Sequence, residues 1–188
     1  MCGRLNIIDD PLSHMINNLL GIEFSTQTNP DLRPSETVEV IAGQHGELLT
    51  QPLKWGIQPE WAKRIIINAQ SETVATKPTF SAAFGYNRVI VPCSGWYEWQ
   101  GAKGSKRKYL FANPDDSPVW MAGIALELGE KLVTLTTQPN LQCSEYHHRM
   151  PLLLNDQDLM DWLFGDSGAA KKLLMNRWQA ELRIEECA

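Results

Sequence analysis

Short runs of β-branched and aromatic residues, separated by Gly, Pro, Asn or Asp, recur along most of the chain. Runs of this kind are typical of β-strands. Thr37–Ala42 and Glu47–Leu53 are predicted to form a hairpin around the turn Gly43–Gly46. Further strands are expected at Arg64–Asn68, Arg88–Pro92, Trp96–Gln100, Lys108–Ala112, Val119–Leu126, Lys131–Thr137 and Arg183–Glu185.

A helical spacing of apolar residues replaces this pattern near both ends of the chain. Residues 10–20 are predicted to be a helix, because Asp9 or Asp10 can cap it, Pro11 suits its first turn and Gly21 can end it. Two more helices are expected at Asn155–Leu163 and Ser167–Trp178. Many non-local strands with helices at the ends predict an α+β fold rather than alternating βαβ units.

Composition fits one globular domain spanning residues 1–188, since 43% of the residues are hydrophobic and no repeat or linker interrupts the chain. No apolar run approaches the roughly 20 residues of a membrane span. The first ten residues, MCGRLNIIDD, lack the apolar stretch of a secretory signal. We therefore expect a cytoplasmic monomer without a membrane partner.

The four cysteines form no C-x-x-C pair, so neither a disulfide framework nor a structural zinc site is expected. Only His147 and His148 lie near a cysteine, Cys143, and adjacent histidines seldom aim at one ion. We expect no metal and no cofactor.

The formal charge of −5 argues against a non-specific binder of polyanions. The charge is uneven, however: residues 1–110 hold 11 basic and 10 acidic residues, whereas residues 111–188 hold 6 and 12. Residues 1–110, which are nearly neutral overall, could still bind a few phosphate groups.

Cys2 is the most unusual residue by position. If Met1 is removed, Cys2 becomes a 1,2-aminothiol whose amine condenses with an aldehyde and whose thiol then closes a thiazolidine ring. Alternatively, the thiolate attacks an acyl carbon with the terminal amine as base. The plain interpretation is a residue in a disordered tail.

Four other segments carry candidate chemistry, and each also has a structural explanation. Glu98 lies among Trp and Tyr, where desolvation suits acid–base work, but strand alternation could instead point it to solvent. His147 could donate a proton and Arg149 could bind an anion. Alternatively, the histidine only caps a helix and the arginine only forms an ion pair. Asn68 could orient a substrate or close a turn. Trp61, in a Gly/Pro loop after Trp55, could stack on bases or belong to the core.

Taken together, the segments MCGR, W-G-I-x-P-x-W, N-A-x-S-E-T, V-P-x-x-G-W-Y-E-W and H-x-R-M-P closely resemble the SRAP family (SOS response associated peptidase). The resemblance runs from residue 2 to about residue 165. It implies one domain with mixed, antiparallel and barrel-like sheets and peripheral helices, to which residues 166–188 add a helix and a short strand. It also implies an activity: crosslinking to abasic sites in single-stranded DNA during the DNA damage response.

The resemblance also implies roles for individual residues. Cys2 would be the crosslinking nucleophile, Glu98 would move protons, His147 would act on the sugar, and Asn68 would hold the opened sugar or the N-terminal segment. Removal of Met1 would be autocatalytic, and strand cleavage by β-elimination could accompany crosslinking. The implied DNA contacts are Arg4, Trp61, Gln70, Trp99 and Arg149.

Two departures from the family pattern concern DNA contacts. Gln70 stands where the family usually has Arg, and Pro30–Pro34 replaces a loop close to Y-N-x-A-P, with Arg33 as a substitute cation. His148 remains an alternative to His147. Two other functions stay open: a peptidase or amidohydrolase with Cys2 as nucleophile, and a non-covalent single-strand-binding module.

Overall fold

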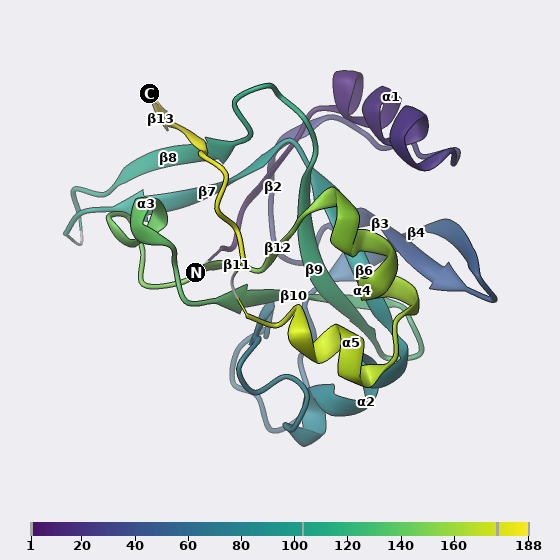
Figure 1. Ribbon diagram of the computed structural model, residues 1–188. Helices are drawn as coiled ribbons and strands as arrows, with labels where there is room; N and C mark the ends of the chain where they lie inside the picture. Colours follow the sequence, from purple (N-terminus) through teal and green to yellow (C-terminus); the bar gives the residue numbers. More distant parts are fainter. Residues whose placement is uncertain (1, 103, 176, 188) are drawn as a thin grey trace.

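The computed structural model describes residues 2–102, 104–175 and 177–187 as two sheets flanked by short helices (Figure 1). The helices are α1 (Asp9–Leu20), α2 (Pro78–Tyr86), α3 (Leu141–Ser144), α4 (Leu159–Phe164) and α5 (Ser167–Lys172), with a 3₁₀ turn η1 (Asp156–Asp158). The strands are β1 (Leu5–Ile7), β2 (Asn29–Leu32), β3 (Thr37–Gln44), β4 (Glu47–Trp55), β5 (Asn68–Gln70), β6 (Arg88–Cys93), β7 (Gly95–Gln100), β8 (Arg107–Ala112), β9 (Val119–Leu126), β10 (Lys131–Thr137), β11 (Met150–Pro151), β12 (Leu153–Leu154) and β13 (Arg183–Cys187).

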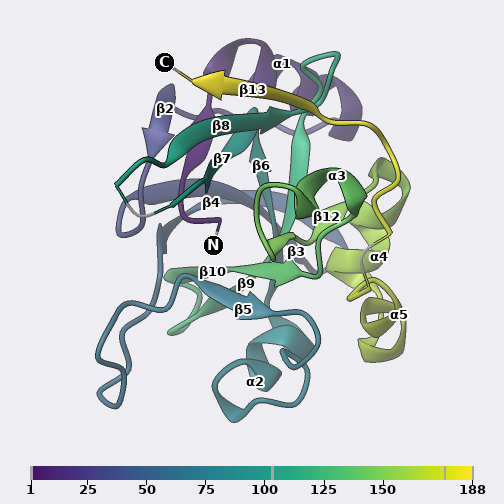
Figure 2. The same cartoon turned by 90° about the vertical axis from the view of Figure 1, so that its left-hand side faces the viewer.

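One sheet has the strand order β13-β8-β7-β1-β2, and the other runs β11-β10-β4-β3-β6-β9-β12. In the second sheet β10 pairs with β9 as well as with β4, so the path β4-β3-β6-β9-β10 closes into a ring. Figure 2 shows the N-terminal end of the chain entering between the two sheets. The expected α+β fold with mixed, barrel-like sheets is confirmed.

Large aromatic side chains fill the core. The indoles of Trp55, Trp96, Trp120 and Trp162 are almost completely buried. Trp96 stacks on Phe111 across β7 and β8, with ring centroids 5.0 Å apart. Every residue of β6 is buried, which explains its continuous apolar run. This packing gives the site a rigid support.

Most of the strands predicted from the hydrophobic pattern are present, including the β3–β4 hairpin, and Gly21 ends α1 in the left-handed conformation. Three expectations are wrong. The N-cap of α1 is Ile8, which makes no side-chain capping hydrogen bond, so neither Asp9 nor Asp10 caps this helix; both lie in its first turn. The strand predicted at Arg64–Asn68 is only a bridge between Ile57 and Ile66, and regular pairing begins at Asn68. The helix predicted at Ser167–Trp178 ends at Lys172, because Leu173 and Trp178 turn into the core; residue 176 lies outside the described part.

Neither a membrane-spanning helix nor a metal-binding cluster is found among the described residues. No helix there has the length and apolar character needed to cross a bilayer. No group of three or more His, Cys, Asp or Glu side chains in the same residues could hold an ion.

Candidate functional site

Cys2 is held in the interior by the strand that follows it. β1 lies between β7 and β2, pairing Leu5 with Trp96 on one side and with Leu32 on the other. Because β1 is paired on both edges, the N-terminal segment is ordered, and Cys2 is only 2% exposed. The interpretation of Cys2 as part of a disordered tail is therefore wrong. Met1 lies outside the described residues.

Glu98 on β7 faces this thiol. Glu98 is 3% exposed, so the alternative in which it points to solvent is also wrong. Burial raises the pKa of the Cys2 thiol well above its ordinary value, and the charge of Glu98 and its hydrogen bond to the thiol raise that pKa further. A carboxylate in contact with a protonated thiol can accept its proton when the thiol attacks an electrophile.

Asn68 ties Cys2 to the second sheet. Its Nδ2 donates to the carbonyl oxygen of Cys2 at 3.2 Å. The hydroxyl of Thr134 lies 2.6 Å from Asn68 Oδ1, and it meets Asn68 because β5 and β10 pair in that register. This contact fixes the amide orientation, so that its nitrogen faces the N-terminal segment.

His147 is a titratable group that, like the Cys2 thiol, lies close enough to Glu98 to be affected by its charge. His147 Nδ1 lies 3.0 Å from the backbone nitrogen of Arg149 and 3.1 Å from its carbonyl oxygen, so the backbone of Arg149 fixes the orientation of the ring. Burial lowers the pKa of His147, against the opposing charge of Glu98, and so favours the neutral ring. His148 is exposed and stacks on the His147 ring with centroids 4.2 Å apart. The charge of Glu98 therefore acts on His147, which is also the more buried of the two histidines.

Arg149 is already engaged by protein atoms. Its Nη1 and Nη2 donate to the carboxylate of Glu72 at 2.7 and 2.8 Å, and Nη2 also donates to the carbonyl of Thr136 at 2.6 Å. Its side chain is 9% exposed. A phosphate at this guanidinium would have to compete with Glu72, whereas the Arg149 backbone already orients His147.

The Glu72–Arg149 pair gives a test of how the site is held together. Hydrogen bonds from Arg149 lower the pKa of Glu72 below its usual value of 4.5. The Glu72–Arg149 pair therefore stabilises the fold fully above pH 4.5. This stabilisation is lost as the pH falls through the lowered pKa that Glu72 has in the folded protein. Glu72→Gln should lower the free energy of unfolding by about 1 kcal/mol at pH 7, a modest loss because the Glu72 side chain is 41% exposed and solvent screens the pair. Urea unfolding should show this gap closing towards pH 3. Glu47→Gln, on an exposed hairpin residue, is the control; a gap that stays constant with pH would contradict the assignment.

The other four predicted DNA contacts, Arg4, Trp61, Gln70 and Trp99, are at least partly exposed. Arg4 Nη1 lies 2.8 Å from Asp31 Oδ2, and its guanidinium is 5.6 Å from the centroid of the half-buried Trp99 ring. Gln70 is exposed at the end of β5, and Trp61 is 68% exposed in the loop before it. Trp61 is thus not a core residue, and its indole is open to a stacking partner.

Three neighbours of the site were not anticipated from the sequence. Thr134 carries no local signal, because it meets Asn68 only through strand register. Glu72 stands in the N-A-x-S-E-T segment and could have been matched to the Arg of H-x-R-M-P. Cys143, whose pKa burial and the charge of Glu98 raise to about 12, is a second buried thiol near that carboxylate.

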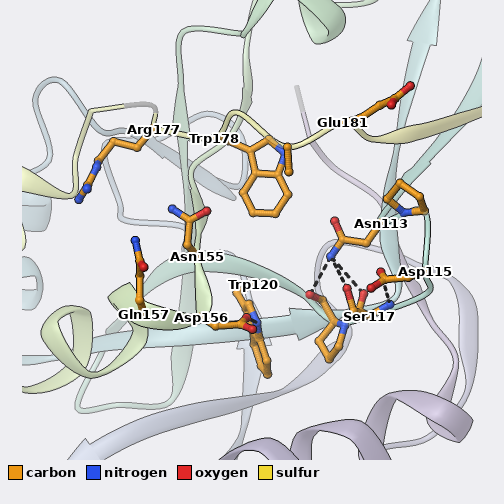
Figure 3. A pocket seen from close by; sticks show the side chains of 13 residues that line it. Asn113, Asp115, Ser117, Trp120, Asn155, Asp156, Gln157, Arg177, Trp178 and Glu181 are labelled. Carbon is orange, nitrogen blue, oxygen red and sulfur yellow. Dashed lines mark hydrogen bonds between the residues drawn. The ribbon is translucent and has the colours of Figure 1, made fainter.

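A large cavity lies elsewhere. It has a volume of about 860 Å³, and Figure 3 shows Trp178 and Asn155 on one side and Asn113, which hydrogen-bonds Ser117, on the other. None of the predicted site residues lines it. The Cys2 site is therefore recognised by its chemistry rather than by the size of a pocket.

Fold and site define a class: an α+β protein with a buried thiol beside its N-terminus, in contact with a carboxylate and near an imidazole. The chain belongs to the SOS response associated peptidase (SRAP) family, whose model matches residues 1–187.

Named relatives and solved structures agree with this membership. The chain is 27% identical over 189 residues to the abasic site processing protein YoqW of Bacillus subtilis, covering 87% of this chain and 80% of YoqW. It is 27% identical to the abasic site processing protein YedK of Escherichia coli, covering 87% and 79%. A protein from Bordetella bronchiseptica superposes with a TM-score of 0.82 over all of both chains at 21% identity. A phage-related protein of the same organism gives 0.81, covering 99% and 94%, also at 21%. These two structures show the fold alone.

Proposed function

We propose that this protein recognises abasic sites in single-stranded DNA and bonds to them through Cys2. The observation that carries the proposal is the thiol of residue 2 buried against Glu98, with Asn68 holding the Cys2 carbonyl. The names of the relatives support the substrate, since they are abasic site processing proteins.

The chemistry needs Met1 to be removed, which frees the α-amine of Cys2. The amine adds to the C1′ aldehyde of the open sugar and the adduct loses one water, giving an imine. The thiol then adds to the imine carbon, and its proton passes to the imine nitrogen. The product is a thiazolidine, and the balance is protein plus DNA minus one water. Glu98 is placed to take the thiol proton and return it to nitrogen.

The remaining residues serve the sugar and the strand. His147, held at Nδ1 by the backbone of Arg149, gives or takes a proton at the sugar during ring opening and during any strand cleavage. Asn68 orients the N-terminal segment. The indoles of Trp61 and Trp99 stack on bases beside the lesion, while Arg4 and Gln70 meet the backbone. Arg149 acts mainly by holding His147.

Intact mass spectrometry tests this proposal directly. The protein is mixed with a single strand carrying one abasic site, with the undamaged strand, and with a strand whose abasic analogue lacks the aldehyde. After Met1 loss is verified in the spectrum, only the aldehyde strand should give an adduct, at the summed mass minus one water. Equal reversible binding to all three strands would contradict the proposal and favour a non-covalent module. Turnover of a small amide without DNA would favour a hydrolase.

A further inference from the structure

Three cationic side chains converge on one carboxylate at the surface of the five-stranded sheet. Asp31, in β2, accepts from Arg4 at 2.8 Å, from Arg33 at 2.9 Å and from Lys108 at 2.8 Å. Lys108 starts from β8 and crosses the ring of Tyr97, 3.9 Å from its centroid, to reach Asp31. We call Arg4, Arg33, Lys108 and Asp31 the Asp31 cluster.

The Asp31 cluster contains more cationic than anionic side chains, since one carboxylate faces three cations. The hydrogen bond from Lys108, followed by that from Arg33 and the charges of Arg4 and Lys108, holds the pKa of Asp31 well below its usual range. Asp31 is therefore ionised at any working pH, and three cations against one anion leave a net charge of +2. Within a chain of net charge −5, this is a local excess of the opposite sign.

The Asp31 cluster adjoins both an aromatic surface and the reactive residue. Trp99 lies within 6 Å of both cations that flank it: 5.6 Å from the guanidinium of Arg4 and 5.8 Å from the ammonium of Lys108, measured to its ring centroid. Arg4 is two residues from Cys2, a span of at most about 7 Å of extended chain. The side chains remain partly accessible, from 23% for Arg4 to 64% for Arg33.

We propose that Arg4, Arg33 and Lys108 form a subsite for a backbone phosphate next to the base that stacks on Trp99, and that Asp31 occupies this subsite in the free protein. The inference rests on the proposed function. It adds Lys108 to the cations that meet DNA, joins Arg33 and Arg4 to the same subsite, and makes Asp31 the internal competitor of the phosphate. A phosphodiester offers the same acceptor chemistry as a carboxylate, and guanidinium and ammonium groups bind both. Because Asp31 competes with the phosphate, undamaged strands bind weakly.

The competition predicts effects of opposite sign. Lys108→Met keeps the stem over Tyr97 and removes the charge, and Arg33→Met removes an exposed charge that the core does not need. Each should weaken binding of an undamaged single strand about threefold to tenfold at low salt. Each should also make the plot of log affinity against log salt shallower, by at most about 0.7, the full contribution of one phosphate contact. Asp31→Asn should strengthen binding by a similar factor.

Arg183→Met is the matched control. Arg183 is ion-paired to Asp116 at 2.6 Å and is 34% exposed, close to the 29% of Lys108. It pairs opposite Ala112, so it lies four residues along β8 from Lys108, or about 13 Å. Arg183→Met removes one positive charge, as Lys108→Met and Arg33→Met do, but it should leave the slope of log affinity against log salt unchanged.

Fluorescence anisotropy with undamaged single strands, from low to physiological salt, measures these slopes. Equal slopes for Lys108→Met, Arg33→Met and Arg183→Met would overturn the phosphate subsite, as would weaker binding by Asp31→Asn. The covalent proposal fails separately. The wild type could give no adduct with an aldehyde strand while Lys108→Met and Arg33→Met still show shallower salt slopes than Arg183→Met. That result would support the phosphate subsite and contradict the covalent bond.

Discussion

Replacing Cys2 with serine should reduce the heat-stable adduct with an abasic strand by at least about 100-fold. Serine keeps the α-amine after Met1 removal, so the imine still forms, but a hydroxyl closes the ring far less readily than a thiol. The substitution is nearly isosteric, and a hydroxyl can still donate to Glu98, so the buried site keeps its shape. Denaturing gels after heating, with and without borohydride, measure the result. Wild type needs no reductant to survive heating, whereas Cys2→Ser should survive only after borohydride has reduced the imine.

The matched control is Cys143→Ser, which alters the other buried thiol in the field of Glu98 and should retain the heat-stable adduct. A Cys2→Ser protein that gives as much heat-stable adduct as the wild type would refute the thiazolidine. Loss of adduct in both variants would place the effect on folding of the site rather than on the nucleophile.

Glu98→Gln should slow crosslinking by about 100- to 1,000-fold, the usual loss when an acid–base group is removed. The direction is informative because two effects oppose each other. The charge of Glu98 raises the pKa of Cys2, so its removal lowers that pKa and increases the thiolate fraction at neutral pH. If thiolate concentration alone set the rate, the variant would be faster. A slower variant shows that proton transfer by Glu98 outweighs its electrostatic cost.

Two measurements separate these effects. The pH dependence of Cys2 alkylation, followed by mass, should shift to lower pH in Glu98→Gln, while the crosslinking rate falls at every pH. Glu145→Gln, which alters an exposed carboxylate, should match the wild type in both. A rate equal to or above that of the wild type would remove Glu98 from the proton-transfer step.

Local patterns predicted the strands well, because each carries its own β-branched run and its own turn. The hairpin of β3 and β4 is an example. α2 was missed, since its residues are apolar without a clear amphipathic stripe and Phe80 and Phe84 are both buried. A helix of that kind cannot be told from a buried strand by periodicity alone.

The site could be predicted only as a set of separate candidates. Alternation along β7 would leave Glu98 in solvent if one face of the sheet were open. β7 is a central strand, however, and Tyr97 is 7% exposed beside Glu98 at 3%, so both faces are covered. The contact between Asn68 and Thr134 joins residues 66 positions apart, and strand register alone creates it. Local sequence holds no signal for such pairings.

The central position of β1 has a mechanical consequence. DNA bonded to Cys2 would be attached to a strand that is paired on both edges, with β7 and with β2. Tension along β1 would load both rows of backbone hydrogen bonds together, in shear, instead of peeling an end away one residue at a time. Tension on such a crosslink would therefore be carried by the whole five-stranded sheet. Unfolding would still leave the covalent bond intact, so the protein would leave the DNA only if the thiazolidine were reversed or the chain were cut.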